Sequence, residues 1–461
     1  MSYKFRKNAD PGEWCSVLLP SSMLSLSLSH GGGLYSFLFV ISSWLSAVDF
    51  LTRHVLKNDF RSKHFTHAFY LISSVVISLF VWKYFSYYSC FFHVITLNYL
   101  IVCCYNYIVR ILLEKCPGSF TMGEAQVLTQ SIVLFFLSNE IFLSRKISSY
   151  KNIHSFIEIP DHAKCLQVLL LGCFSLIFLT YSIPSLRRVS KFFALFIATS
   201  VIMMYAWRFY LNENIFIWLL KFCLQSQERV YLLLFWVACT FICTLFVVLI
   251  NLSSVPNGSA LIRKVFHFII TAVYVPGILY DLELLRLSSG IAFAAFLMLE
   301  LSRVLKIPPI GSTIENAFQI FLDEKDTGLL ILTHIYLLVG CSFPIWLCGY
   351  SNETKGFHIC LMSGILSVGI GDTVAAMCGK SFGHHKWKGT SKTIEGSIGC
   401  FLVQMIFGFI FFCFAGHSYT CRNIILLTIA VASTSYLEAK TNQVDNLVLP
   451  LFMFPILSLI H

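Results

Sequence analysis

Apolar residues run along this chain in long uninterrupted blocks, and blocks long enough to cross a bilayer recur nearly from end to end. They lie at 35–51, 66–88, 90–114, 125–143, 163–183, 190–207, 230–251, 265–280, 286–304, 328–350, 356–378, 396–416, 422–437 and 445–460. Lipid offers no hydrogen bonds to a peptide group, so spanning segments must be helices or a closed barrel, and continuous runs of this length favour helices. The pattern predicts an all-α integral membrane protein, a polytopic bundle of about 13 to 15 transmembrane helices.

The composition supports the same class. Hydrophobic residues make up 57% of the 461 positions and charged residues only 12%, and the mean hydropathy is +0.76. A soluble globular protein is excluded, because so few charges do not cover a soluble surface. The segment 209–223 is ambiguous between a short span and a helix lying in the membrane interface, and we favour the interface.

The loops change in character along the chain. The 17 cysteines are scattered through apolar blocks without metal-site spacing, as is typical of small buried side chains. Beyond about residue 250, however, the loops carry charged and patterned sequence that the earlier loops lack. We therefore expect a multi-span N-terminal membrane region of unknown role, 1–250, and a membrane domain that carries the chemistry, 251–461.

Four charged loops in the second half are separated by pairs of predicted spans, so they open on one face of the membrane. These loops are 252–264, 305–327, 379–395 and 438–445. Lysine and arginine number ten in and beside these loops but three in the loops opposite them. The positive-inside rule then places the charged loops in the cytoplasm. The net charge of +10 agrees with this orientation and does not indicate nucleic-acid binding.

The most unusual stretch is GDTVAAMCGKSFGHHKWKGTSKTIEGS, residues 371–397, which interrupts two apolar blocks. Its glycines allow the backbone N–H groups to approach an anion, and its lysines supply charge for a polyphosphate. The glycines are Gly371, Gly379, Gly383, Gly389 and Gly396, and the lysines are Lys380, Lys386, Lys388 and Lys392. The start of the following helix adds a favourable dipole for phosphate. These features together suggest a nucleoside triphosphate site.

Asp372 lies near the end of an apolar block, where an unpaired carboxylate is costly, and coordination of Mg²⁺ would explain its presence. Glu395 is a second candidate, as a metal or ribose partner. On spacing alone, a lysine-rich loop beside a membrane is as often a topology signal or an anchor for anionic headgroups. No Walker A motif is present, because Val374 stands where that motif needs its first glycine.

At these residues the chain resembles a family of CTP-dependent membrane lipid kinases that act on dolichol, phytol or diacylglycerol. The resemblance rests on GDTVAAMCGKSFG with KGTSKTIEGS, on LIRKVFHF (261–268), and on SYLEAKTNQVDNLVLPL (435–451). An acidic stretch like FLDEKDTG (321–328) lies between them in the dolichol kinases. The match covers about residues 255–461, and the long multi-span extension before it favours the polyprenol, or dolichol, branch.

The resemblance implies that the second half is a CTP-dependent lipid kinase domain of the endoplasmic reticulum membrane, acting on dolichol for glycan assembly. Candidate catalytic residues are Arg263, Lys264, His267, Asp326, Asp372 and Lys392. Candidate nucleotide-binding residues are Gly379, Lys380, Gly383, Lys386, Lys388, Gly389, Thr390, Ser391, Lys392, Thr393, Glu395 and Gly396. Asp372 and Asp445 are the candidate Mg²⁺ ligands. Nothing in these residues distinguishes cytosine from adenine, so CTP is implied by the resemblance alone.

Other interpretations stay open. Arg263 and Lys264 are equally typical of residues that flank a span, and His267 alone is more typical of a core histidine. Phosphatidate cytidylyltransferases share a Lys-Thr-x-Glu-Gly element, although the tail here, Asp445-Asn446, lacks their Gly-His-Gly-Gly run. A multi-span transporter is the alternative from a different class, although transporters tend to carry midplane charges and inverted repeats.

Overall fold

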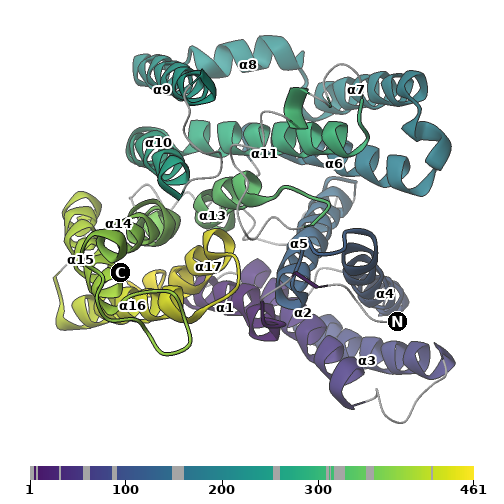
Figure 1. Ribbon diagram of the computed structural model, residues 1–461. Helices are drawn as coiled ribbons and strands as arrows, with labels where there is room; N and C mark the ends of the chain where they lie inside the picture. The colour runs from purple at the N-terminus through teal and green to yellow at the C-terminus, as the bar shows by residue number, and fades with distance from the viewer. Residues whose placement is uncertain are drawn as a thin grey trace. The chain divides into compact units, whose positions relative to one another are not determined.

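The computed structural model describes residues 5–6, 9–30, 33–55, 63–85, 91–147, 160–252, 260–307, 311, 313–315, 328–348, 358–416 and 419–460. Within these residues the chain is helical almost throughout and contains no β-strand (Figure 1). The prediction of an all-α polytopic membrane protein is confirmed. The chain forms two compact units, Met1–His154 with Thr327–Leu329 and Asn442–Val444, and the remainder from Ser155 onward.

Unit 1 consists of the helices α1 to α5 with two short helical turns. These are η1 (Glu13–Val17), α1 (Leu18–His30), α2 (Gly33–Phe50), η2 (Leu51–Val55), α3 (Lys63–Tyr84), α4 (Phe91–Lys115) and α5 (Met122–Ile147). Each of α1 and α3 packs on the helix that follows it, and α5 packs on both α4 and η1. Helix α1 falls outside the predicted spans.

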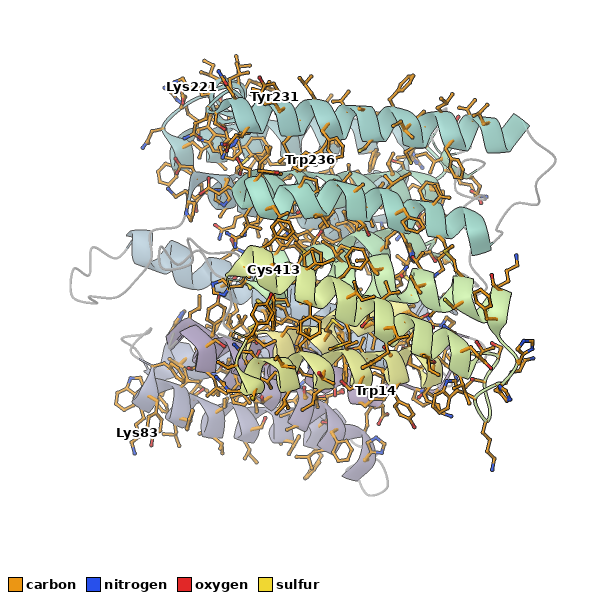
Figure 2. All side chains as sticks on the ribbon, turned by 90° about the vertical axis from the view of Figure 1, so that its left-hand side faces the viewer. Trp14, Lys83, Lys221, Tyr231, Trp236 and Cys413 are labelled. Carbon is orange, nitrogen blue, oxygen red and sulfur yellow. The ribbon has the colours of Figure 1, made fainter. Side chains whose placement is uncertain are left out.

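Unit 2 holds the rest of the described helices. They are α6 (Asp161–Ser182), η3 (Pro184–Arg187), α7 (Val189–Leu211), α8 (Ile215–Cys223), α9 (Gln227–Leu252), α10 (Ala260–Tyr280), α11 (Leu282–Val304), α13 (Thr333–Leu347), η5 (Ile359–Met362), η6 (Ile365–Asp372), α14 (Thr373–Phe382), α15 (Ile394–Ala415), α16 (Cys421–Lys440) and α17 (Asp445–Leu457). Helix α6 packs between α7 and α11, and α9 packs on α10. Trp236 of α9 points toward α10 and donates a hydrogen bond to the carbonyl oxygen of Val273 at 3.1 Å (Figure 2).

Nine helices in the described part of the chain are long and apolar enough to cross a membrane, and three shorter apolar helices accompany them. The predicted total of about 13 to 15 spans stays a prediction. Helix α8 has nine residues and spans about 14 Å, too short for a hydrocarbon core of about 30 Å. Its length agrees with an interfacial position for the ambiguous segment.

The segment Ile359–Phe382, made of η5, η6 and α14, forms the centre of unit 2. Its most apolar window is 89% buried inside the protein, whereas the corresponding window of α7 is only 6% buried. Helices α10, α13, α15, α16 and α17 pack around η6. The side chains of η6 therefore face protein and not lipid.

Close packing at this centre depends on glycine. A Cβ on Gly369 would lie 2.2 Å from Oγ1 of Thr271 in α10, and one on Gly371 would lie 1.9 Å from Nε2 of Gln404 in α15. The backbone of η6 is wound as a π-helix, a rare conformation that often marks functional positions. Asp372 is its last residue, so the packing of small residues brings a carboxylate into the core of the unit.

Candidate functional site

Asp372 is the centre of a buried group of charged side chains. Its Oδ2 pairs with the ammonium group of Lys264, and Nδ1 of His267 lies 3.5 Å from the same oxygen. Both partners come from α10, where positions 264 and 267 lie on one face of the helix. Asp372 is 6% exposed and His267 5%, so the carboxylate interacts with both partners with little solvent between them.

A second ion pair completes the group. Lys392, at the end of the loop before α15, pairs through Nζ with Oε1 of Glu438 near the end of α16. The Glu438 side chain is 3% exposed and that of Lys392 is 38% exposed. Burial alone would lower the pKa of Lys392, but Asp445, Glu438 and Asp372 outweigh it and raise that pKa, so the side chain stays protonated at neutral pH.

Residues far apart in the sequence thus form one charged cluster. We define it as Lys264, His267, Asp372, Lys392 and Glu438, which are joined by the pairs above, together with Asp445, whose negative charge acts on Lys392. Positive and negative groups alternate, which compensates the cost of taking each charge out of water. Such a group can neutralise a phosphate with its lysines and accept a proton with a carboxylate or with His267.

The loop before α15 is folded back on itself. The N–H of Trp387 donates to the carbonyl oxygen of Lys392 at 2.9 Å, and the N–H of Ile394 donates to that of His385 at 2.8 Å. The Trp387 indole donates to Oγ of Ser397 at 3.0 Å and packs edge-on against Tyr436 of α16. These contacts fix the base of the loop. Its outer side chains, Lys386 and Lys388, are exposed.

Most glycines of the 371–397 stretch serve helix packing. A Cβ on Gly383 would lie 2.2 Å from the carbonyl oxygen of Gly379, and one on Gly396 would lie 2.7 Å from that of Ala375. A Cβ on Gly379 would lie 2.9 Å from Oγ1 of Thr393. Gly389 differs, because its φ of +82° requires glycine at an open turn. Together with Gly371, which packs against α15, all five glycines thus have a structural reason that involves no ligand.

The other predicted nucleotide-binding residues lie around this loop. Lys380 is exposed on the last turn of α14, Ser391 is exposed, and Thr390 is half-buried. Thr393 caps α15, since its Oγ1 accepts from the N–H of Gly396 at 3.2 Å. Glu395 accepts from His385, with 2.6 Å between Oε1 and Nδ1, so its partner in the structure is local.

The side chains of two predicted catalytic residues, Arg263 and Asp326, are not described by the structure. Arg263 belongs to α10, but its side chain lies outside the described residues, as does Asp326 entirely. Glu438, in contrast, is a member of the cluster that was not among the predicted site residues. The sequence did hold a signal for it, because Glu438 lies within the SYLEAKTNQVDN stretch that carries the family resemblance.

The cluster contains donor atoms of the kind that a magnesium ion takes. Asp372, Glu438 and Asp445 offer carboxylate oxygens, the ligands that Mg²⁺ prefers. Within the described residues, no group of three or more His, Cys, Asp or Glu side chains lies so that it could hold a metal ion by itself. The lysines pair with these carboxylates in the structure.

Comparisons with known proteins give a consistent result. A family model described as dolichol kinase matches residues 57–394. The dolichol kinase of Mus musculus is 33% identical over 366 residues, which cover 76% of this chain and 67% of that protein. The dolichol kinase EVAN of Arabidopsis thaliana is 29% identical over 392 residues, covering 76% and 67%. That of Saccharomyces cerevisiae is 31% identical over 245 residues, covering 52% and 44%. No solved structure matches the chain.

Proposed function

This chain belongs to the dolichol kinase family, and from that premise we propose that it transfers the γ-phosphate of CTP to the hydroxyl group of dolichol with the help of Mg²⁺. Phosphorylation of dolichol is the activity that the family relationship supports. The donor nucleotide, the metal and the roles of individual residues are the proposal.

One observation carries the proposal for the site. Four separate segments contribute to two ion pairs, Lys264 with Asp372 and Lys392 with Glu438, whose carboxylates are buried. The segments are α10, the junction of η6 and α14, the loop before α15 and the end of α16. The charge of Asp372 also acts on Lys392. Phosphoryl transfer requires mainly positioning and charge neutralisation. A buried group of fixed charges is suited to both, because it needs little reorganisation when charge develops on the phosphate.

The residues have the following proposed roles. Lys392 and Lys264 exchange their carboxylate partners for phosphate oxygens when the nucleotide binds, and Arg263 meets the transferred phosphoryl group from α10. Lys380, Lys386, Lys388, Thr390 and Ser391 guide the triphosphate at the loop 383–393. The proton of the lipid hydroxyl passes to His267 or to a carboxylate of the cluster.

Asp372 and Asp445 are the proposed holders of Mg²⁺, and Asp326 stays a candidate from the sequence, since it lies outside the described residues. When bound, the ion supplies positive charge that neutralises the triphosphate. The ion would also balance the negative charge of the carboxylates, so that the lysines could leave them and bind phosphate oxygens. This arrangement explains why acidic and basic residues are interleaved in the cluster.

The substrate also fits a membrane domain of this kind. A polyprenol keeps its tail among lipid chains and presents its hydroxyl at the interface. We place the enzyme in the endoplasmic reticulum membrane with the charged loops in the cytoplasm, where CTP is available. The excess of basic residues on those loops supports the orientation.

Labelled CTP tests the reaction. Purified protein, Mg²⁺ and dolichol are incubated with CTP labelled at the γ-phosphate or, in parallel, at the α-phosphate. We expect label in the lipid only from the γ position. Label from the α position means cytidylyl transfer, and transfer from neither position contradicts the enzyme assignment with CTP.

A further inference from the structure

The segment 442–444, which joins α16 to α17, belongs to unit 1 and not to the unit of those two helices. The guanidinium group of Arg6 donates to the carbonyl oxygen of Asn442 at 2.9 Å. The N–H of Val444 donates to Oε1 of Glu124 at 3.0 Å. The backbone of the segment is therefore held by two residues that lie more than 300 positions earlier in the chain.

Arg6 and Glu124 form a buried ion pair, and Glu124 is held in place by further hydrogen bonds. Their side chains are 2% and 0% exposed and meet at 2.8 Å between Nη2 and Oε1. Glu124 also accepts from the N–H of Thr121, and Oγ1 of Thr121 accepts from the N–H of Glu124. This reciprocal pair is a capping box at the start of α5, so Glu124 is fixed by its own helix.

Gln443 is held on both sides of its amide group. Its Nε2 donates to Oδ1 of Asp10 at 2.6 Å, and its Oε1 accepts from Oγ1 of Thr121 at 2.5 Å. Gln443 is 0% exposed. Gly12 leaves the space for it, because a Cβ there would lie 2.4 Å from the Gln443 side chain. Gln443 therefore occupies a specific buried position and does not make a surface contact.

Asp445 follows Val444 directly and is the first residue of α17. We infer that Arg6 and Glu124 are positioning residues for the charged cluster, because the segment they hold fixes the start of α17 and hence the carboxylate of Asp445. The inference rests on the proposed function for the role of Asp445. It assigns these two residues an indirect role, which acts through the chain that leads into Asp445.

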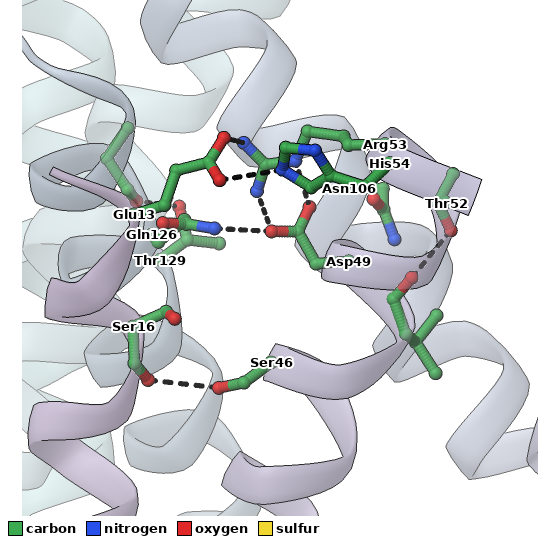
Figure 3. A network of polar contacts seen from close by, with 12 residues as sticks. Glu13, Ser16, Ser46, Asp49, Thr52, Arg53, His54, Asn106, Gln126 and Thr129 are labelled. Carbon is green, nitrogen blue, oxygen red and sulfur yellow. Dashed lines mark hydrogen bonds and ion pairs between the residues drawn. The ribbon is translucent and has the colours of Figure 1, made fainter. Parts of the chain in front are cut away.

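The test compares two buried carboxylates of unit 1 that both pair with arginine. Glu124→Gln removes the charge that holds the 442–444 segment. Asp49→Asn is the matched control, because Asp49 is 3% exposed and pairs with Arg53 and Gln126 but does not contact the segment (Figure 3). Arg6→Lys serves as the conservative variant and Gln443→Ala as a variant on the segment itself.

Two readouts are measured on full-length protein purified in detergent. The first is amide hydrogen exchange of peptides covering 441–447. The second is the Mg²⁺ concentration that gives half-maximal transfer of label to dolichol, together with the KM for dolichol. Supporting groups of this kind typically contribute about 10- to 100-fold to metal affinity or activity.

We expect Glu124→Gln and Gln443→Ala to speed exchange over 441–447 and to raise the half-maximal Mg²⁺ concentration about 10-fold or more. Asp49→Asn should change neither, the KM for dolichol should stay within about twofold in all variants, and Arg6→Lys should be intermediate. Unchanged exchange in Glu124→Gln, or effects no larger than those of Asp49→Asn, overturns the inference. If the wild-type chain transfers no label, the proposed function fails, whereas the exchange readout still decides whether the ion pair holds the segment.

Discussion

The two ends of the lysine-rich loop differ sharply, although the sequence presents their lysines alike. Lys392 is drawn into the charged cluster by Glu438 and by the negative charge of Asp445 and Asp372. Lys386 and Lys388 are exposed on the outer part of the same loop. A lysine that is paired with a carboxylate is fixed in position before substrate arrives. An exposed lysine attracts the substrate only through an electrostatic interaction that salt screens.

The difference separates two contributions to function. Groups fixed in the cluster can lower the barrier of the chemical step, because their orientation is prepared in advance. Groups on the outer loop mainly raise the local concentration of a polyanion. The predictions below follow this order, from the cluster outward.

Asp372→Asn should have the largest effect. The change keeps the shape of the side chain but leaves Lys264 without its counter-charge and His267 without the carboxylate beside its ring, so we expect kcat to fall by at least about 100-fold. Transfer of label from γ-labelled CTP to dolichol measures it. Asp161→Asn is the matched control, because Asp161 is an exposed carboxylate that pairs with Lys164 on α6. Equal activity of the two variants would mean that Asp372 is not part of the catalytic site.

Glu438→Gln should come next, with a fall in kcat of about 10- to 100-fold. Glu438 is buried and holds Lys392 through an ion pair, so its loss lets the lysine move. The double variant with Lys392→Met shows whether the two residues act together, because coupled residues lose much less than the product of their separate effects. Independent effects would mean that Glu438 acts in its own right, for example on the lipid hydroxyl.

Lys386→Ala with Lys388→Ala should have a moderate effect of a different kind. We expect the KM for CTP to rise about 3- to 10-fold while kcat stays within about twofold, and the difference to shrink at high salt. Lys221→Ala is the control, since Lys221 is also exposed but belongs to α8. A large fall in kcat would show that these lysines reach the transferred phosphate, and the distinction between loop and cluster would fail.

Much of the fold could be predicted, because long apolar blocks in a membrane leave little choice but helix. Helix α1 was not predicted, because its sequence alternates leucine with serine. In the structure the hydroxyls of Ser22 and Ser29 donate hydrogen bonds to carbonyl oxygens one turn earlier. Such bonds satisfy the hydroxyls within the helix, so a serine-rich stretch still suits a buried position.

The candidate site was predictable only in part. Asp372 and Lys392 are conspicuous in the sequence because charge beside an apolar block is costly, and their roles stay predictions. The pairing of Lys392 with Glu438 was not predictable, because no local spacing predicts that residues 46 positions apart will pair. Glycine was ambiguous in the same way. Gly396 suggested an anion site, whereas its place in the structure is a close contact between α15 and α14.

Glu395→Gln should have the smallest effect and is the sharpest test of the boundary between cluster and loop. In the sequence Glu395 is a candidate metal or ribose partner, but in the structure its carboxylate is bound by the ring and N–H of His385 at the base of the loop. Exposed ion pairs contribute little, so we expect kcat and the half-maximal Mg²⁺ concentration to stay within about twofold. A 10-fold or larger shift in Mg²⁺ dependence would mean that Glu395 turns from His385 toward the metal when the nucleotide binds.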